Sequence, residues 1–415
     1  MTISRPATGL LLAVLLMTAA SADAKRVRAP EPLETARQEI PEEQLLDVGI
    51  ELFGTGLPAN DPEALGELEE EGVYEDVRRA EARFIAVHLM ETLQSTGYWG
   101  AVRILPKAAG EIDLKVGGRI LESNGIDLEV EVWARDATGK QWLKRSYKEE
   151  ANLGHYREDL DREPFQSLYN TIANDLRKKL QRFDPEERLA IRRTSQMRFA
   201  GDLAPDAFKS YLEKDSRGRY DIVRLPADGD VMMERISRIR SRDELFVDTL
   251  SAHYAAFSAG MSDPYFQWRR YSFDEENARR DLRRQARTRQ ILGVLAIVGA
   301  VVAGSEDDSG VIRDLAVIGG IEAFRSGSAK FQEAKLHRES LRELASSFDA
   351  EVTPLLVEIE GETLRLSGSV ETQYAEWREL LRRLLSEETG RPLDPDGDGV
   401  LEWPTGPEAT TAPDE

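Results

Sequence analysis

The sequence contains no cysteine among its 415 residues. This absence excludes thiol nucleophiles, disulfides, cysteine zinc sites, iron–sulfur clusters and a lipid anchor on an N-terminal cysteine. Basic residues are also fewer than acidic ones. The chain has 55 lysines and arginines and 76 aspartates and glutamates, which gives a formal net charge of −21. Such an acidic chain lacks the basic surface that neutralises phosphates, so we expect no nucleic-acid partner.

Histidine is scarce, and the few histidines are scattered. The chain has four of them: His88, His155, His253 and His337. No two have the spacing that places metal-binding imidazoles on one helical face, and no Gly-x-Ser-x-Gly motif accompanies them. The Gly54-Thr-Gly56 and Gly117-Gly118 stretches do not continue as phosphate-binding loops. The sequence therefore indicates no catalytic residue and no cofactor-binding residue.

Long hydrophobic runs are few, and the first lies at the N-terminus. Arg5 precedes an apolar run over residues 9–20, and Ala22-Asp23-Ala24 has the small-x-small pattern of a secretory cleavage site. The run is shorter than the roughly 20 residues that a membrane span needs. We therefore expect a signal peptide, export to a periplasm, and a flexible Pro- and Glu-rich leader before the first domain.

Strand and helix patterns alternate over residues 45–183. They predict strands that include 45–53, 112–116, 126–132 and 141–147, and helices at 74–96 and 164–183. Asn124-Gly125 is a strong hairpin signal, because both residues tolerate a positive φ. We expect an α+β domain in the order β-α-β-β-β-β-α, with one half-buried antiparallel sheet and two helices packed on one face.

Residues 184–290 are predicted to be mostly helical and heavily charged, with a break at 226–230. A long solvated helix held by i,i+4 charge pairs is expected from Tyr271 to Gln290, and it ends in the basic run 279–289. Four aromatic residues near its start form either a binding surface or part of the core: Tyr265, Phe266, Trp268 and Tyr271.

An uncharged segment, residues 291–304, follows the basic run directly, and a second apolar stretch spans 311–324. Ala296, Ala300 and Gly304 lie four residues apart, which allows close helix–helix contact. One interpretation is a buried or self-associating helix. The other is membrane contact through 279–304, with the arginines on anionic headgroups. Both interpretations make this segment an interaction element.

The C-terminal part shows a helix, a hairpin and a second helix. Residues 355–359 and 364–370 alternate around Gly361-Glu362, and helical spacing returns from Tyr374 to Leu385. The stretch from Val357 to Val370, which ends in Leu-Ser-Gly-Ser-Val, resembles the BON domain, a small envelope module. The resemblance covers about 50 residues, lacks the family's final strand, and implies association with phospholipid.

The N-terminal element order is similar to that of the small β/α domains of envelope accessory lipoproteins, namely penicillin-binding-protein activators and auxiliary lipoproteins of ABC transporters. Those proteins carry a lipidated cysteine, which this chain lacks. The expected organisation is a signal peptide (1–24), a flexible leader (25–44), a β/α sandwich-like domain (45–183), a charged helical region (184–290), an apolar Gly/Ala-rich helical segment (291–324), a small BON-like α-β-β-α module (331–390) and an acidic disordered tail (391–415).

Three aspartates in the tail, Asp394, Asp396 and Asp398, match the opening of a calcium loop. Gly399 follows at the position of the sharp turn, whereas Thr405 replaces the expected bidentate glutamate. Two interpretations stay open, a calcium site and a plain acidic tail. Calcium is the only cofactor that the sequence suggests.

The sequence therefore predicts a non-enzymatic, exported accessory or adaptor protein of the cell envelope. We expect it to bind an envelope protein or a second copy of itself through 291–324, or a membrane surface through 279–304. The alternative is an exported hydrolase that uses a pair of carboxylates and is supported by calcium.

Overall fold

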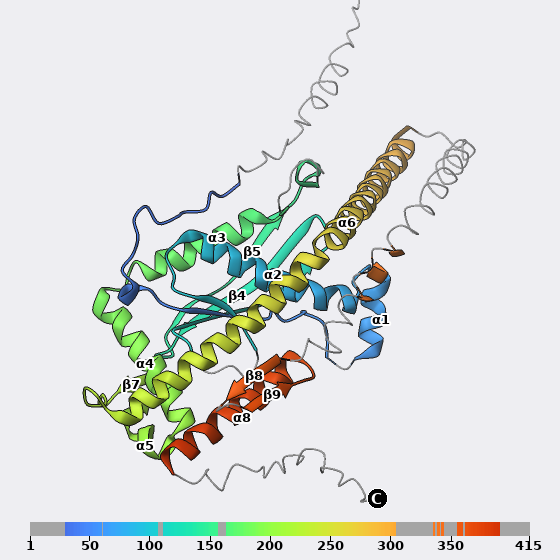
Figure 1. The fold of residues 1–415 in the computed structure, drawn as a ribbon. Coiled ribbons are helices and arrows are strands. Elements are labelled where there is room, and N and C mark those ends of the chain that lie inside the picture. Colours follow the sequence, from blue (N-terminus) through green and yellow to red (C-terminus); the bar gives the residue numbers. More distant parts are fainter. Residues whose placement is uncertain are drawn as a thin grey trace, which may run out of the picture.

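The computed structural model describes residues 30–59, 61–106, 111–156, 163–303, 355–359 and 362–390, together with the helical residues 335–336, 338–340 and 342–343. The architecture is mixed α+β (Figure 1), with a five-stranded sheet in the N-terminal half and a helical middle. The predicted signal peptide, the second apolar stretch and the acidic tail lie outside the described residues.

The sheet has the strand order β2-β1-β3-β4-β5. Its strands are β1 (Val48–Glu51), β2 (Val102–Leu105), β3 (Leu114–Ser123), β4 (Asp127–Asp136) and β5 (Gln141–Glu150). The pairs β3–β4 and β4–β5 are antiparallel, but β1 runs parallel to both β2 and β3. The expectation of a purely antiparallel sheet is therefore wrong.

The parallel pairing follows from the connection between β1 and β2. This connection contains α1 (Pro62–Glu70) and α2 (Glu75–Thr96), which return the chain to the end of the sheet where β1 began. Such a crossover joins parallel neighbours, whereas a tight turn joins antiparallel ones. The sequence patterns had indicated α2 but neither α1 nor the bounds of β2, whose four residues are all buried and show no alternation.

The hairpin predicted at Asn124-Gly125 is confirmed. The side chain of Asn124 accepts hydrogen bonds from the backbone N–H groups of Ile126 and Asp127, and Gly125 has a φ of +82°. A Cβ at Gly125 would also collide with the backbone of α6 at Arg269 and Phe273. Only glycine therefore suits both the turn and the close contact between this hairpin and the long helix.

Two helices pack against the sheet and against each other, as expected. They are α2 and α3 (Gln166–Leu180), and α3 begins shortly after the predicted start at Pro164. Val116 and Val130 of the sheet share one hydrophobic core with Leu89 of α2 and Ile172 of α3. Short 3-10 turns span Glu42–Gln44, Leu153–Tyr156 and Lys209–Tyr211.

The middle of the chain is dominated by one helix, α6 (Val231–Ala303), which is 73 residues long. It follows α4 (Pro185–Leu203), α5 (Pro205–Phe208) and a small hairpin of β6 (Leu212–Lys214) and β7 (Tyr220–Ile222). The break predicted at 226–230 is confirmed, because α6 starts just after it and the Asp230 side chain accepts a hydrogen bond from the Met233 N–H. The helix thus begins far before Tyr271.

The aromatic cluster on α6 is largely core. Tyr265 is 1% exposed and Trp268 is 8% exposed, and both pack with Val77 and Phe84 of α2. Of the two interpretations of this cluster, the structure supports the core for these two residues. Beyond Phe273, α6 passes into an exposed stretch at 281–284 and continues as a helix to Ala303.

The C-terminal residues pack on the outside of α6. Strands β8 (Leu355–Ile359) and β9 (Glu362–Leu366) form an antiparallel pair, and α8 (Val370–Thr389) follows. Tyr374 and Trp377 of α8 are buried against Phe246 of α6. The helix expected before β8 falls mostly outside the described residues. Among the helices of the described part, none has the length and apolar character needed to cross a membrane.

Candidate functional site

A cleft of about 820 Å³ opens where α6 passes the β3–β4 turn. Its walls come from α1, α2, the end of β3, α6 and the helical residues between 335 and 343. This volume lies in the range of sites that enclose a small organic molecule. Residues 55–57, which follow β1, also line the cleft, so six separate segments build it and it exists only in the folded chain.

The floor of the cleft is a closed polar network around Glu81 of α2, which is only 3% exposed. The Glu81 carboxylate accepts hydrogen bonds from Arg78 at 3.1 Å, from the Ser123 hydroxyl at 2.5 Å and from the Tyr265 hydroxyl at 2.5 Å. Burial, together with the neighbouring Glu81 charge, raises the pKa of Tyr265 well above its ordinary value. Tyr265 therefore stays a neutral donor, and the negative charge of Glu81 is satisfied within the protein.

A buried ion pair lies next to this floor, in contact with Tyr265. Arg269 of α6 binds Glu163 through two parallel hydrogen bonds of 2.5 and 2.8 Å. Burial favours the neutral carboxyl, but the guanidinium of Arg269 outweighs it and lowers the pKa of Glu163. The guanidinium carbon also lies 4.2 Å from the centre of the Tyr265 ring. A bidentate, stacked arginine of this kind holds α6 in a fixed position against the floor.

One wall of the cleft is apolar and aromatic. Tyr74 and Trp268 meet edge to face with ring centres 5.5 Å apart, and the ring centres of Tyr271 and Trp268 are 6.1 Å apart. Leu68 and Leu121 extend this wall, and Leu121 is 43% exposed. The cleft therefore presents carbon surface to solvent as well as polar groups.

Cationic side chains also line the cleft. Two of them, Arg78 and Arg269, bind buried carboxylates, and five more belong to the lining: Arg279, Arg283, Lys335, Arg338 and Arg342. Three of these have partners, since Arg279 contacts Glu275 and Glu276, Lys335 contacts Glu339, and Arg338 lies 4.0 Å from the centre of the Tyr74 ring. Within the described part of the chain, Arg283 and Arg342 have no carboxylate within 4.0 Å.

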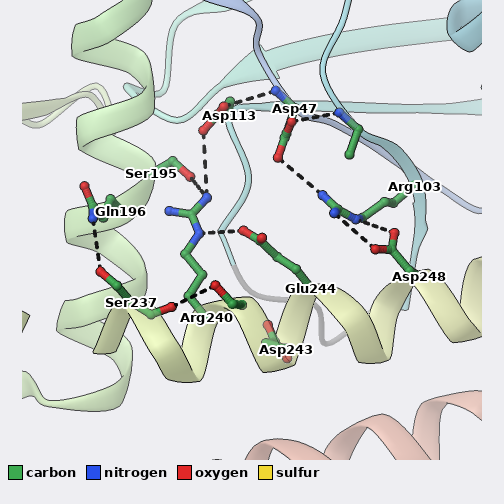
Figure 2. Close-up of polar contacts among 12 residues, drawn as sticks. Asp47, Arg103, Asp113, Ser195, Gln196, Ser237, Arg240, Asp243, Glu244 and Asp248 are labelled. Atoms are coloured by element: carbon green, nitrogen blue, oxygen red, sulfur yellow. Dashed lines mark hydrogen bonds and ion pairs between the residues drawn. The ribbon is translucent and has the colours of Figure 1, made fainter. Parts of the chain in front are cut away.

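A second polar cluster lies at the other end of the sheet, between the strands, α4 and α6 (Figure 2). Arg240 of α6 donates to Ser195 of α4 at 3.1 Å and to Glu244 at 3.0 Å, and lies 4.0 Å from Asp113. Burial raises the pKa of Asp113, although Arg240 opposes this effect. Arg240 thereby joins α4, α6 and the chain entering β3.

Arg103 makes the matching connection from β2. Its guanidinium binds Asp248 of α6 at 2.6 and 3.2 Å and Asp47 at 3.3 Å. The cavity beside this cluster measures only about 30 Å³. Ser195 is fully buried there and contacts both Arg240 and the Asp113 carboxylate, and the small cavity leaves no room for a substrate, so the geometry suits a structural anchor.

The sequence-predicted metal residues Asp394, Asp396 and Asp398 lie outside the described residues, so calcium binding stays a prediction. Within the described part, no group of three or more histidine or acidic side chains is placed to hold a metal ion. His88 bonds Gln166 at 2.8 Å and stacks on Phe84, so its imidazole is engaged within the fold.

The sequence did not predict the cleft. Arg279, Arg283, Trp268 and Tyr271 belonged to patterns already singled out, but nothing in their spacing placed them beside Tyr74 or Arg342. Comparison of the chain with models of protein families, with curated proteins and with solved structures found no match.

Proposed function

We propose that this chain is an exported, non-enzymatic accessory protein of the cell envelope that acts through the C-terminal end of α6. The observation that carries the proposal is the continuity of α6: one helix is anchored along the sheet and extends beyond it to Ala303 (Figure 1). Contact with a membrane surface or with a second copy of the chain through this end fits that arrangement.

The first part of α6 is firmly attached to the domain. Arg240 and Asp248 bind partners from the sheet, and the Ser251 hydroxyl accepts from the Ile104 N–H at 3.0 Å and donates to the Ile104 carbonyl at 3.3 Å. Further along, Arg280 binds Asp127 at 2.5 Å. These contacts make the domain a rigid base for the rest of the helix.

The end of α6 is different in chemistry and position. Residues 281–284 are exposed, and the sequence then changes from the basic run ending at Arg289 to the uncharged residues 291–303. At about 1.5 Å per residue, the stretch from 284 to Ala303 is roughly 30 Å long. A basic segment followed by an uncharged helix is typical of sequences that contact an anionic membrane surface or another helix.

The described polar clusters support a binding role over a catalytic one, because they are paired within the fold and anchor α6. The BON-like character of residues 331–390 and the likeness of residues 45–183 to lipoprotein domains are part of the same proposal. The order β8, β9, α8 supports the first of these. The periplasm is the compartment that we propose.

Fractionation of the native host's envelope tests this proposal, with the protein followed with and without residues 291–304. We expect the full chain to pellet with membranes and resist alkaline carbonate, or to self-associate in solution, and the deletion to lose that behaviour while keeping its circular dichroism. A deletion that unfolds would assign 291–304 to the core. Unchanged behaviour of a folded deletion would also reject the proposal.

A further inference from the structure

We infer that the cleft beside α6 binds a single anionic amphiphile, with a carboxylate or phosphate head on Arg283 and Arg342 and an apolar body along the wall of Tyr74, Leu68 and Tyr271. This inference concerns the cleft and does not depend on what the end of α6 contacts. Three features of the cleft lead to it: the charge of its rim, the state of its carboxylates and the nature of its wall.

Among the described residues, no carboxylate within 4.0 Å balances the positive charge of these two arginines, in a chain with a net charge of −21. Arg283 comes from α6 and Arg342 from the helical residues after 335, so two separate elements each contribute an arginine to the lining of one cleft. Within the described part, neither has a carboxylate within 4.0 Å, while Arg279 and Arg338 beside them do. Guanidinium groups match the planar oxygen pairs of carboxylate and phosphate.

Carboxylates also line the cleft, but most are already neutralised. They are Glu71, Glu81, Glu122, Glu275, Glu276 and Glu339. Each of them except Glu71 has a cationic side chain within 4.0 Å in the described part of the chain. An entering anion therefore meets little unpaired negative charge, and Glu81 at the floor cannot release its three donors without cost.

The apolar wall explains why the ligand needs a carbon body as well as a charge. Tyr74, Tyr271 and Leu68 are half-buried, and Leu121 is 43% exposed, which leaves apolar surface facing the cleft. Burying such surface is favourable, because it removes apolar carbon from water. An inorganic anion would use the arginines alone, whereas an amphiphile uses the arginines and the apolar wall.

The test is isothermal titration of the purified full chain with dodecyl phosphate and with dodecanoate, each below its critical micelle concentration. The two ligands separate a phosphate head from a carboxylate head. Inorganic phosphate tests the anionic head alone, and dodecyl maltoside tests the dodecyl chain on an uncharged head. We expect saturable 1:1 binding of at least one anionic amphiphile, and at least tenfold weaker binding of both controls.

The variant R283E/R342E should weaken binding by roughly tenfold or more, since it removes two charge-assisted contacts. R284E is the matched control, because Arg284 is the next residue of α6, is 77% exposed at its side chain and does not line the cleft. Both variants alter exposed side chains, and thermal unfolding verifies that they fold. A brominated dodecanoate should also quench Trp268, and the quenching should fall in W268F.

Equal affinity of R283E/R342E and R284E would overturn the inference, as would equal binding of dodecyl maltoside. Binding only to anionic vesicles, with none of the monomeric amphiphiles, would also overturn it and indicate a membrane surface. Deletion of residues 291–304 distinguishes this inference from the proposed function. The deletion should leave amphiphile binding intact even where it abolishes membrane pelleting or self-association.

Discussion

Glu149 illustrates how a single buried carboxylate couples this fold to pH. It lies near the end of β5, and its side chain accepts a hydrogen bond from the Leu168 N–H in the first turn of α3. Burial is the main cause that raises the pKa of Glu149 to about 7, and Glu163 adds to it, whereas the bonds from Leu168 and Ser167 act in the opposite direction. The group is therefore protonated in the folded protein at mildly acidic pH.

The consequence for stability has a definite sign. Between the ordinary pKa of 4.5 and about 7, folded Glu149 binds more protons than the unfolded chain does, so its contribution to stability falls as the pH rises. We expect E149Q, which keeps an acceptor for Leu168, to raise the free energy of unfolding at pH 8 by on the order of 1 kcal/mol after solvent screening. At pH 4.5 the change should be small.

Urea unfolding at pH 4.5 and pH 8 measures this difference. E150Q is the control, because Glu150 is the next residue, is exposed, and should give no such pH-dependent difference. A gain from E149Q that is equal at both pH values would contradict the interpretation.

At the scale of elements, the edge of the sheet is covered by a helix. Strand β2 pairs with β1 on one side only, and its free side faces α6. The Ser251 hydroxyl bonds both the N–H and the carbonyl of Ile104 on that free side, and Arg103 next to it binds Asp248. An uncovered edge strand is an aggregation hazard, and α6 removes it here.

We expect S251A to reduce the free energy of unfolding by about 1–3 kcal/mol, because two buried backbone groups of Ile104 would lose their partner. Chemical denaturation measures the loss, and turbidity on heating reports any exposure of the edge. S241A is the matched control, since Ser241 is exposed on the same helix and bonds only the Ser237 carbonyl. A cost for S251A no larger than that for S241A would show that α6 covers β2 through packing alone.

At the scale of the whole molecule, one buried carboxylate connects the C-terminal helix to the rest. Asp243 of α6 accepts hydrogen bonds from Tyr374 at 3.3 Å, Trp377 at 3.2 Å and Arg378 at 3.3 Å. Burial raises the pKa of Asp243, while Arg378 and the two aromatic donors oppose the rise. Arg378 also reaches Asp202 of α4, so α8 holds α4 and α6 together.

We expect D243A to weaken the attachment of α8 by about 3–5 kcal/mol, because it leaves the buried guanidinium of Arg378 without its inner partner. Hydrogen exchange of residues 370–389 should then accelerate more than exchange in the sheet. D202A is the control, since Asp202 is 48% exposed at its side chain and surface pairs contribute about 0–1 kcal/mol. Equal exchange in D243A and the unaltered chain would contradict this role.

Local sequence patterns alone were sufficient to predict most elements of the N-terminal domain. The alternation around β4, the Asn124-Gly125 turn and the periodic stripe of α2 depend on neighbours in sequence, so their prediction was confirmed. The charge pattern also predicted a helix from Tyr271 to Gln290, although α6 starts far earlier than expected. The signal peptide, the BON-like module and the calcium loop remain predictions of the sequence.

Tertiary structure decided what no local pattern contains. Strand β2 shows no alternation because α6 buries its outer side, and the parallel pairing of β1 follows from a crossover of two helices. The cleft likewise brings Tyr74 and Arg342 together, although most of the chain separates them in sequence. Periodicity reports which face of an element is buried. Which distant element buries that face is set by packing the whole chain, and this packing produced the cleft.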